Sequence, residues 1–185
     1  MFEFLKQYLK NPRSVGAIAP SSRMLAENMM KPVDFGRAAC IVEYGPGTGV
    51  FTEELIRRKR PETALYIIER NNEFYRQIKE KYGELPKVRV IHGSAENTTR
   101  YLKKYGETSA DYIVSGLPFT SLPKELSDRI LADTQKAIGD DGVFVTFQYT
   151  RVKEAYFKTF FDLTEKIHVK KNLPPAYVMV MRNKR

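Results

Sequence analysis

The sequence is poor in cysteine and in long apolar runs. Its one cysteine, Cys40, cannot form an internal disulfide, and we expect it to be buried as a small hydrophobic side chain. No apolar run approaches the ~20 residues that a membrane-spanning helix needs. The first ten residues lack the apolar core and the cleavage site of a secretory signal. These absences argue against a secreted or membrane-spanning protein and predict a cytoplasmic one.

The chain also lacks repeats, low-complexity segments and an internal linker. At 185 residues it is long enough to form one domain with a substantial core. Its two histidines, His92 and His168, lie in strand-like runs without a partner pattern. We therefore expect structural roles for both histidines and predict no metal site.

Acidic residues are fewer than basic ones. The chain has 31 Lys and Arg against 22 Asp and Glu, which gives a formal net charge of +9. Basic side chains cluster at residues 57–60, 170–171 and 182–185. Each cluster taken alone is typical of a solvated surface. The total, however, suits a polyanionic partner, either nucleic acid or an anionic membrane surface.

Strand-like and amphipathic runs alternate along most of the chain. The strand-like runs cover residues 40–44, 65–69, 88–92, 112–115 and 143–149. Amphipathic runs typical of helices cover residues 51–59, 72–82, 98–105, 124–138 and 153–161. Two further β-rich runs, 166–172 and 177–182, are joined by a turn at Leu173-Pro174-Pro175. This order predicts an α/β fold with a mostly parallel sheet, helices on both faces and a C-terminal antiparallel hairpin.

About forty residues precede the first predicted strand. In the first ten, Phe2, Leu5 and Leu9 share one helical face, which suits either contact with a membrane interface or packing on the domain itself. A second helix is expected to begin at Pro20-Ser21-Ser22. We therefore divide the chain into N-terminal helices over residues 1–38, which cover the cleft or contact membrane, and a core over residues 39–185.

A glycine-rich motif follows the first predicted strand. It reads Glu43-x-Gly45-x-Gly47-x-Gly49, and Glu69 ends the next strand-like run. Glycine reaches positive φ at low cost and lets a ligand approach the backbone, while a carboxylate in the position of Glu69 binds a ribose diol. Thr48 and Thr52 are expected to cap the helix that follows. An ordinary glycine-rich connection is the alternative, but the second carboxylate in register favours a nucleotide site.

The spacing of these glycines differs from the dinucleotide-binding fingerprint and resembles motif I of the S-adenosylmethionine-dependent methyltransferases. That resemblance implies a Rossmann-like class I methyltransferase fold with seven strands, and S-adenosyl-L-methionine as the cofactor. It places the methionine end of the donor at Glu43 and the three glycines, and the ribose at Glu69, next to Arg70. Ser94 and Ala95, in the turn after the third strand, would border the adenine.

The loop after the fourth strand, Ser115-Gly116-Leu117-Pro118-Phe119, has two resemblances. It is similar to the Asn-Leu-Pro-Tyr motif of the rRNA adenine dimethyltransferases, with Gly116 in place of the asparagine that engages adenine. Over nearly the whole chain, the sequence more closely resembles the bacterial phospholipid N-methyltransferases that act on phosphatidylethanolamine. The segments that carry this likeness are Gly16-Ala17-Ile18-Ala19-Pro20-Ser21-Ser22, the glycine motif, Ser115-Gly116-Leu117-Pro118 and Phe147-Gln148-Tyr149-Thr150.

The second resemblance implies methylation of a phospholipid headgroup amine at the inner face of the membrane, with the N-terminal helix as the anchor. Ser115, Gly116 and Leu117 would face the acceptor, and Phe119 and Tyr149 would form an aromatic wall beside its nitrogen. Tyr149, Glu43 or a water would accept the proton that the amine loses. Two alternatives stay open: an RNA adenine methyltransferase, and a donor-binding regulator without turnover.

Overall fold

The computed structural model describes residues 20–184, with side chains from Arg23 onward. The predicted helix over the first ten residues lies outside this part of the chain. The strands are β1 (Cys40–Tyr44), β2 (Ala64–Glu69), β3 (Val88–His92), β4 (Tyr112–Ser115), β5 (Val143–Gln148), β6 (Phe161–Val169) and β7 (Ala176–Asn183). The helices are α2 (Pro20–Met30), α3 (Val50–Arg58), α4 (Asn72–Tyr82), η2 (Ala95–Asn97), α5 (Thr98–Lys104), α6 (Lys124–Ile138) and α7 (Glu154–Phe160).

The seven strands form one sheet in the order β3-β2-β1-β4-β5-β7-β6. Strands β1 to β5 are parallel, and β7 pairs antiparallel with both β5 and β6. The expected α/β fold with a C-terminal antiparallel hairpin is confirmed. The chain changes direction across the sheet between β1 and β4, so the carboxyl ends of these two neighbours flank the crevice where such folds bind ligands.

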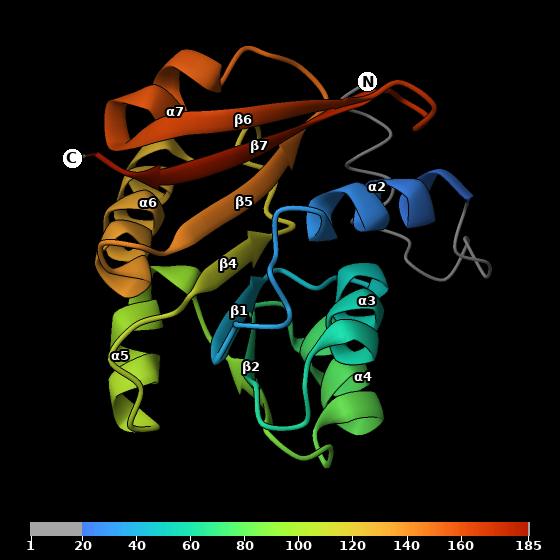
Figure 1. Cartoon of the computed structure of the whole chain (residues 1–185), viewed down its shortest axis with the longest axis vertical. Helices are drawn as coiled ribbons and strands as arrows, with labels where there is room; N and C mark the ends of the chain where they lie inside the picture. The colour runs from blue at the N-terminus through green and yellow to red at the C-terminus, as the bar shows by residue number, and fades with distance from the viewer. Residues whose placement is uncertain (1–19, 185) are drawn as a thin grey trace.

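Helices cover both faces of the sheet. In Figure 1, α5, α6 and α7 lie on one side and α2, α3 and α4 on the other. One face buries a core that includes Val42, Ile113 and Phe144, and the other a core that includes Ile41, Val114 and Val145. Alternate residues of one strand point to opposite faces, so a strand that is buried on both sides is apolar throughout. Cys40 is buried, as expected.

Helix α2 is part of this core. Leu25, Met29 and Met30 are buried and join the cluster that holds Leu55 of α3 and Val180 of β7. Helix α2 therefore packs with the sheet through these three side chains. A membrane-contacting role for the N-terminal region remains a prediction for the residues before Pro20.

The boundary between α7 and β6 differs from the expected one. The predicted strand began at residue 166, whereas β6 begins at Phe161, directly after α7. Phe161 is buried and Leu163 is half-buried, while Asp162 and Thr164 are exposed. The start of β6 therefore alternates as expected for a strand that has one face on the core and one face in solvent. Charged side chains on such an edge strand discourage pairing with another chain. Among the described residues, no helix is long and apolar enough to cross a membrane.

Candidate donor and acceptor site

The glycine loop adopts backbone conformations that favour glycine. Gly45, Gly47 and Gly49 have φ values of 61°, 54° and 89°. A Cβ built at Gly47 meets no atom within 4 Å, so this residue leaves open space at the carboxyl end of β1. Gly49 is the N-cap of α3. The N-cap position is thus occupied by neither Thr48 nor Thr52, and the hydroxyl of Thr52 donates to a different partner.

That partner is Glu43, the last acidic residue before the glycines. Glu43 is fully buried, and its Oε2 accepts a hydrogen bond of 2.7 Å from Thr52 Oγ1. Its Oε1 is also buried and has no partner among the described residues. Burial raises the pKa of this carboxyl from 4.5 to about 8, and the nearby Glu69 adds to the shift. An enclosed carboxylate oxygen without a donor suits a cationic ligand group.

Glu69 ends β2, the strand that pairs with β1, two residues beyond Ile67, the partner of Glu43. Its Oε1 accepts a 2.7 Å hydrogen bond from the backbone N–H of Asn71, and only 8% of the residue is exposed. Burial raises its pKa, and backbone N–H groups of Asn71, Gly47 and Arg70 oppose the rise. The effect of the Gly47 N–H indicates that the Glu69 carboxyl lies close to the glycine loop. Asn71, which sequence reasoning missed, caps α4 by accepting from the N–H groups of Glu73 and Phe74.

The turn after β3 borders the same crevice. Gly93 N–H donates to the carbonyl of Glu69 over 3.0 Å, and the ring of His92 lies 3.1 Å from the carbonyl oxygen of Arg70. Ser94 is half-buried and precedes the short helix η2, while Ala95 is buried against the sheet. The structure thus brings Glu43, the glycines, Glu69, Arg70 and Ser94 to one edge. Contacts of these residues with adenine remain predictions.

The loop after β4 packs directly on the glycine loop. Gly116 N–H donates to the carbonyl of Tyr44 over 2.8 Å. A Cβ built at Gly116 falls 2.6 Å from the carbonyl oxygen of Gly45, and one built at Gly45 falls 2.8 Å from Leu117 Cδ2. No side chain fits at position 116 unless one of the two loops moves. The close approach explains why glycine stands where related loops have asparagine.

The other predicted acceptor residues lie in different surroundings. Ser115 is fully buried, and its Oγ accepts from Leu117 N–H at 3.2 Å, so it supports the loop from beneath. Phe119 is also fully buried, edge-on to Phe144 and Phe157. This enclosed position does not fit the expected aromatic wall beside an acceptor, because the ring packs in the core under α6 and α7.

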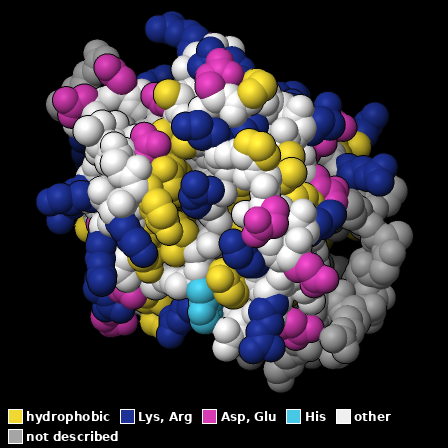
Figure 2. All heavy atoms as spheres, turned by 90° about the horizontal axis from the view of Figure 1, so that it is seen from below, with side chains coloured by type: hydrophobic (Ala, Val, Ile, Leu, Met, Phe, Trp, Pro, Cys, Tyr) yellow, Lys and Arg dark blue, Asp and Glu magenta, His cyan; other side chains and the backbone are white. Residues whose placement is uncertain are grey.

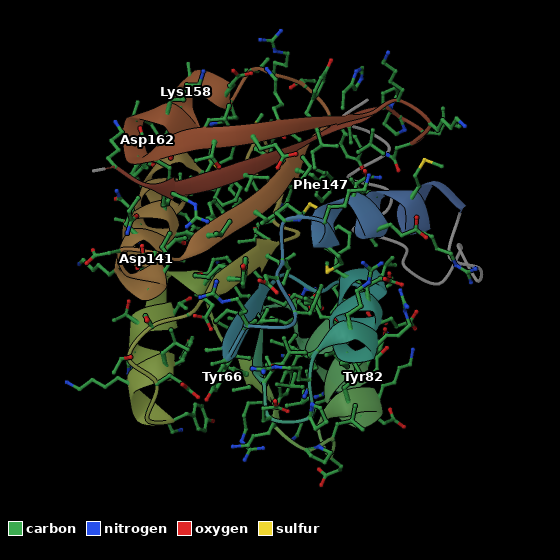
Figure 3. The ribbon with its side chains drawn as sticks, in the orientation of Figure 1. Tyr66, Tyr82, Asp141, Phe147, Lys158 and Asp162 are labelled. Carbon is green, nitrogen blue, oxygen red and sulfur yellow. The ribbon has the colours of Figure 1, made fainter. Side chains whose placement is uncertain are left out.

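Of the two aromatic residues predicted to lie beside the acceptor, Phe119 and Tyr149, only Tyr149 is partly exposed. Its ring packs edge-on to Phe147, with centroids 5.4 Å apart, and Phe147 packs in the same way on Phe51 of α3. Figure 3 shows Phe147 on the side of β5 that faces α2 and α3. Next to it, Gln148 is 3% exposed, and its Nε2 has no partner among the described residues. Gln148 has no role of its own in the prediction from sequence, although a polar residue that ends an apolar strand is a usable signal.

A separate hollow lies beside β3, the edge strand on the side seen in Figure 2. It measures about 320 Å³, and its lining includes Tyr75, His92, Arg100 and Tyr101. None of the residues of the glycine loop or of the loop after β4 line this hollow. It is therefore distinct from the crevice described above.

The crevice fits the predicted donor. Three of its features match parts of S-adenosylmethionine: an unpaired buried carboxylate oxygen for a methionine ammonium, open backbone at Gly47, and the Glu69 carboxylate for ribose hydroxyls. Together they suit a nucleoside-linked amino acid, and the glycines do not follow the G-x-G-x-x-G order that seats a pyrophosphate.

Comparisons with known proteins agree with this reading. The chain matches no protein-family model. It is 30% identical over 176 residues to an ornithine lipid N-methyltransferase from Singulisphaera acidiphila, a match that covers 95% of this chain and 92% of the relative. It is 27% identical to ribosomal RNA small subunit methyltransferase A from Borrelia garinii, where the match covers 80% of this chain and 60% of the relative.

Among solved structures, the N-methyltransferase NodS from Bradyrhizobium japonicum in complex with S-adenosyl-L-homocysteine superposes with a TM-score of 0.73. The match covers 95% of this chain and 93% of NodS at 11% identity, so it supports the fold. Identity to the first relative extends over nearly the full length of both proteins. The chain therefore belongs to the class I S-adenosylmethionine-dependent methyltransferases, in one family with the ornithine lipid N-methyltransferase of Singulisphaera acidiphila.

Proposed function

We propose that this enzyme methylates a primary amine in the headgroup of a membrane lipid. The observation that carries the proposal is the 30% identity to a lipid N-methyltransferase along almost the entire length of both chains. The acceptor is an ornithine lipid or phosphatidylethanolamine, since both present a primary amine at the membrane surface. The protein would act as a peripheral enzyme on the inner face of the membrane.

The donor side of the reaction is assigned to β1, β2 and the loops that follow them. S-adenosylmethionine supplies the methyl group from its sulfonium. Glu43 holds the amino group of the donor, Glu69 holds the ribose, and Ser94 with Ala95 borders the base. Glu43 is enclosed and already accepts from Thr52, so we assign it to donor binding rather than to proton removal.

The acceptor side is assigned to the ends of β4 and β5. The amine nitrogen forms its bond to the methyl carbon as the carbon–sulfur bond breaks, after the nitrogen has passed a proton to water or to Tyr149. Holding the two reactants in line supplies much of the acceleration, roughly 7–11 kcal/mol in favourable cases. Gly116 and Leu117 bring their backbone close to the donor loop. The Gln148 amide can donate to an oxygen of the headgroup.

Methylation of RNA adenine is the second candidate, supported by the identity to a ribosomal RNA methyltransferase. The glycine at position 116 speaks against it. An asparagine side chain there, which related enzymes use to engage adenine, would collide with the Gly45 carbonyl in this loop.

The test uses methyl-labelled S-adenosylmethionine with three acceptors: vesicles that contain ornithine lipid, vesicles that contain phosphatidylethanolamine, and ribosomal RNA. We expect label in one or both lipids and none in RNA. Glu43→Gln should reduce the label strongly, whereas Glu84→Gln, a matched change at an exposed carboxylate, should not. Label confined to RNA would overturn the proposal. A protein that binds donor but labels none of the three would favour a regulator.

A further inference from the structure

Two large apolar side chains stand almost fully in solvent. Val152 is 79% exposed and Leu173 is 81% exposed, about twice the exposed fractions of Leu85 (38%) and Tyr105 (41%). Scattered exposed apolar residues are common and need no explanation. Val152 and Leu173 differ from such scattered residues because both lie beyond the same end of the β5–β7 strand pair.

Both residues lie just beyond one pair of neighbouring strands. Gln148 of β5 pairs with Tyr177 of β7, and Val152 follows Gln148 by four residues, while Leu173 precedes Tyr177 by four. Because β7 runs antiparallel to β5, both segments leave the sheet at the carboxyl end of the parallel strands. That end also carries the glycine loop and Gly116. In Figure 1, the β6–β7 turn and the loop from β5 to α7 both lie along the upper border of the molecule.

Basic side chains predominate next to Val152 and Leu173. Arg151 and Lys153 flank Val152, and Lys170 and Lys171 precede Leu173. Residues 149–153 and 170–175 contain no Asp or Glu. Arg151 pairs with Glu154 at 3.2 Å, but Lys170 and Lys171 are exposed, and no ion pair is seen for either within the described part of the chain. A basic surface with apolar tips is complementary to an anionic lipid interface.

The turn that exposes Leu173 is fixed by hydrogen bonds of the buried Asn172. Asn172 is 4% exposed, its N–H donates to the carbonyl of Val169, and its Nδ2 donates to the carbonyl of Pro174 over 2.6 Å. With Asn172 turned inward, Leu173 and Lys171 on either side of it point to solvent. The exposed leucine is thus part of an ordered turn, so little conformational entropy is lost when it enters another phase.

We propose that Val152 and Leu173 insert into an anionic lipid interface, with Lys170 and Lys171 at the lipid phosphates. This contact turns the carboxyl end of the sheet, and with it the acceptor crevice, toward the membrane. The proposal rests on the proposed function for its substrate and adds a docking surface formed by the catalytic end of the sheet itself.

The test is flotation of the full chain with vesicles of phosphatidylcholine and phosphatidylglycerol. The doubly substituted Val152→Ser, Leu173→Ser variant should lower the partition coefficient by about tenfold or more, since two apolar side chains no longer enter the interface. Lys170→Gln with Lys171→Gln should lower it severalfold, and only for vesicles that contain the anionic lipid. Leu85→Ser and the pair Lys103→Gln, Lys104→Gln are matched controls, because these exposed residues lie at the opposite, amino end of the strands.

Activity separates docking from chemistry. The serine variant should lose methylation of vesicle-borne lipid and keep methylation of a short-chain, water-soluble lipid with the same headgroup. Vesicle binding equal to that of the unaltered chain overturns the proposal. If the serine variant binds vesicles unchanged but loses a dimer that the unaltered chain forms, Val152 and Leu173 are instead a self-association surface. If binding depends on the tips but no lipid is methylated, the docking inference stands and the proposed function fails.

Discussion

At the scale of single residues, the donor-binding role proposed for the buried carboxyl of Glu43 would make donor affinity depend on pH. Its pKa is raised from 4.5 to about 8 by burial, so in the absence of donor the folded state holds a proton that the unfolded chain has released over that range. Stability from this group is therefore complete below pH 4.5 and is lost as the pH rises through about 8. A bound ammonium reverses the preference, because it favours the carboxylate.

We expect Glu43→Gln to weaken donor binding roughly tenfold or more, since a charge-assisted hydrogen bond contributes about 1.5–3 kcal/mol. The variant without donor should unfold at a higher temperature than the unaltered chain at pH 8–9, because it buries no ionisable group at position 43. Calorimetric titration with S-adenosylhomocysteine and thermal unfolding from pH 5 to 9 measure the two effects. A variant that binds donor as tightly as the original would remove Glu43 from the donor site.

Gly47 offers a second prediction with a close control. Gly47→Ala and Gly106→Ala both place a Cβ at positive φ with no atom within 4 Å, so each should cost about 1–2 kcal/mol of stability from backbone strain. Only the first methyl group would project into the donor crevice. Calorimetric titration should show lost donor binding for Gly47→Ala and unchanged binding for Gly106→Ala. Equal donor affinity in both variants would show that the ligand does not approach Gly47.

Individual roles in the site were harder to predict than its location. The glycine motif and the two carboxylates were singled out from their spacing and from its resemblance to a methyltransferase motif, because a ligand that touches backbone demands glycine in a fixed pattern. Ser115 and Phe119 lie in the predicted loop, but both are enclosed. Whether a side chain in a loop points outward or inward depends on neighbours from α6, α7 and β5, which are distant in sequence.

At the scale of elements, strong periodicity located most strands and helices to within a residue. Strands β1, β3 and β4 and helices α4 and α6 have the predicted bounds. The start of β6 was missed because its exposed face carries charged side chains that interrupt the apolar pattern. The packing of α2 could not be predicted either, since an amphipathic helix near the start of a chain suits several partners.

The burial of α2 predicts a large cost for disturbing it. Met29 is completely buried against α3 and the sheet, so Met29→Ala should lower the free energy of unfolding by roughly 2–5 kcal/mol. Glu27→Ala changes an exposed side chain of the same helix and should have little effect. Urea denaturation measures both variants. A small loss for Met29→Ala would indicate that α2 is only loosely attached to the sheet.

At the scale of the whole molecule, the net charge of +9 should control association with lipid. Figure 2 shows Lys and Arg side chains on the β3 side of the protein as well, interspersed with Asp and Glu. Long-range attraction between such a surface and anionic vesicles weakens with ionic strength, because the screening length falls from about 10 Å at 0.1 M salt to about 3 Å at 1 M.

Flotation at increasing salt should therefore show a steep loss of binding to vesicles that contain phosphatidylglycerol. The affinity for S-adenosylhomocysteine should change little over the same range, since the donor crevice depends on buried groups close to the ligand. Binding to anionic vesicles that does not respond to salt would indicate that the apolar side chains alone hold the protein at the interface.

The position of β7 in the sheet also affects how the chain folds during its synthesis. The ribosome delivers β6 before β7, yet β7 lies between β5 and β6 in the finished sheet. While the chain emerges, β5 has no partner on its outer side, and β6 has no place on the sheet until β7 has left the exit tunnel. The site proposed for the acceptor, at the end of β5, would thus become complete only after residues 176–183 are free to pair. Nascent chains that stall before this point would bury neither Val178 nor Met179, and chaperones that recognise exposed apolar strands are expected to bind them.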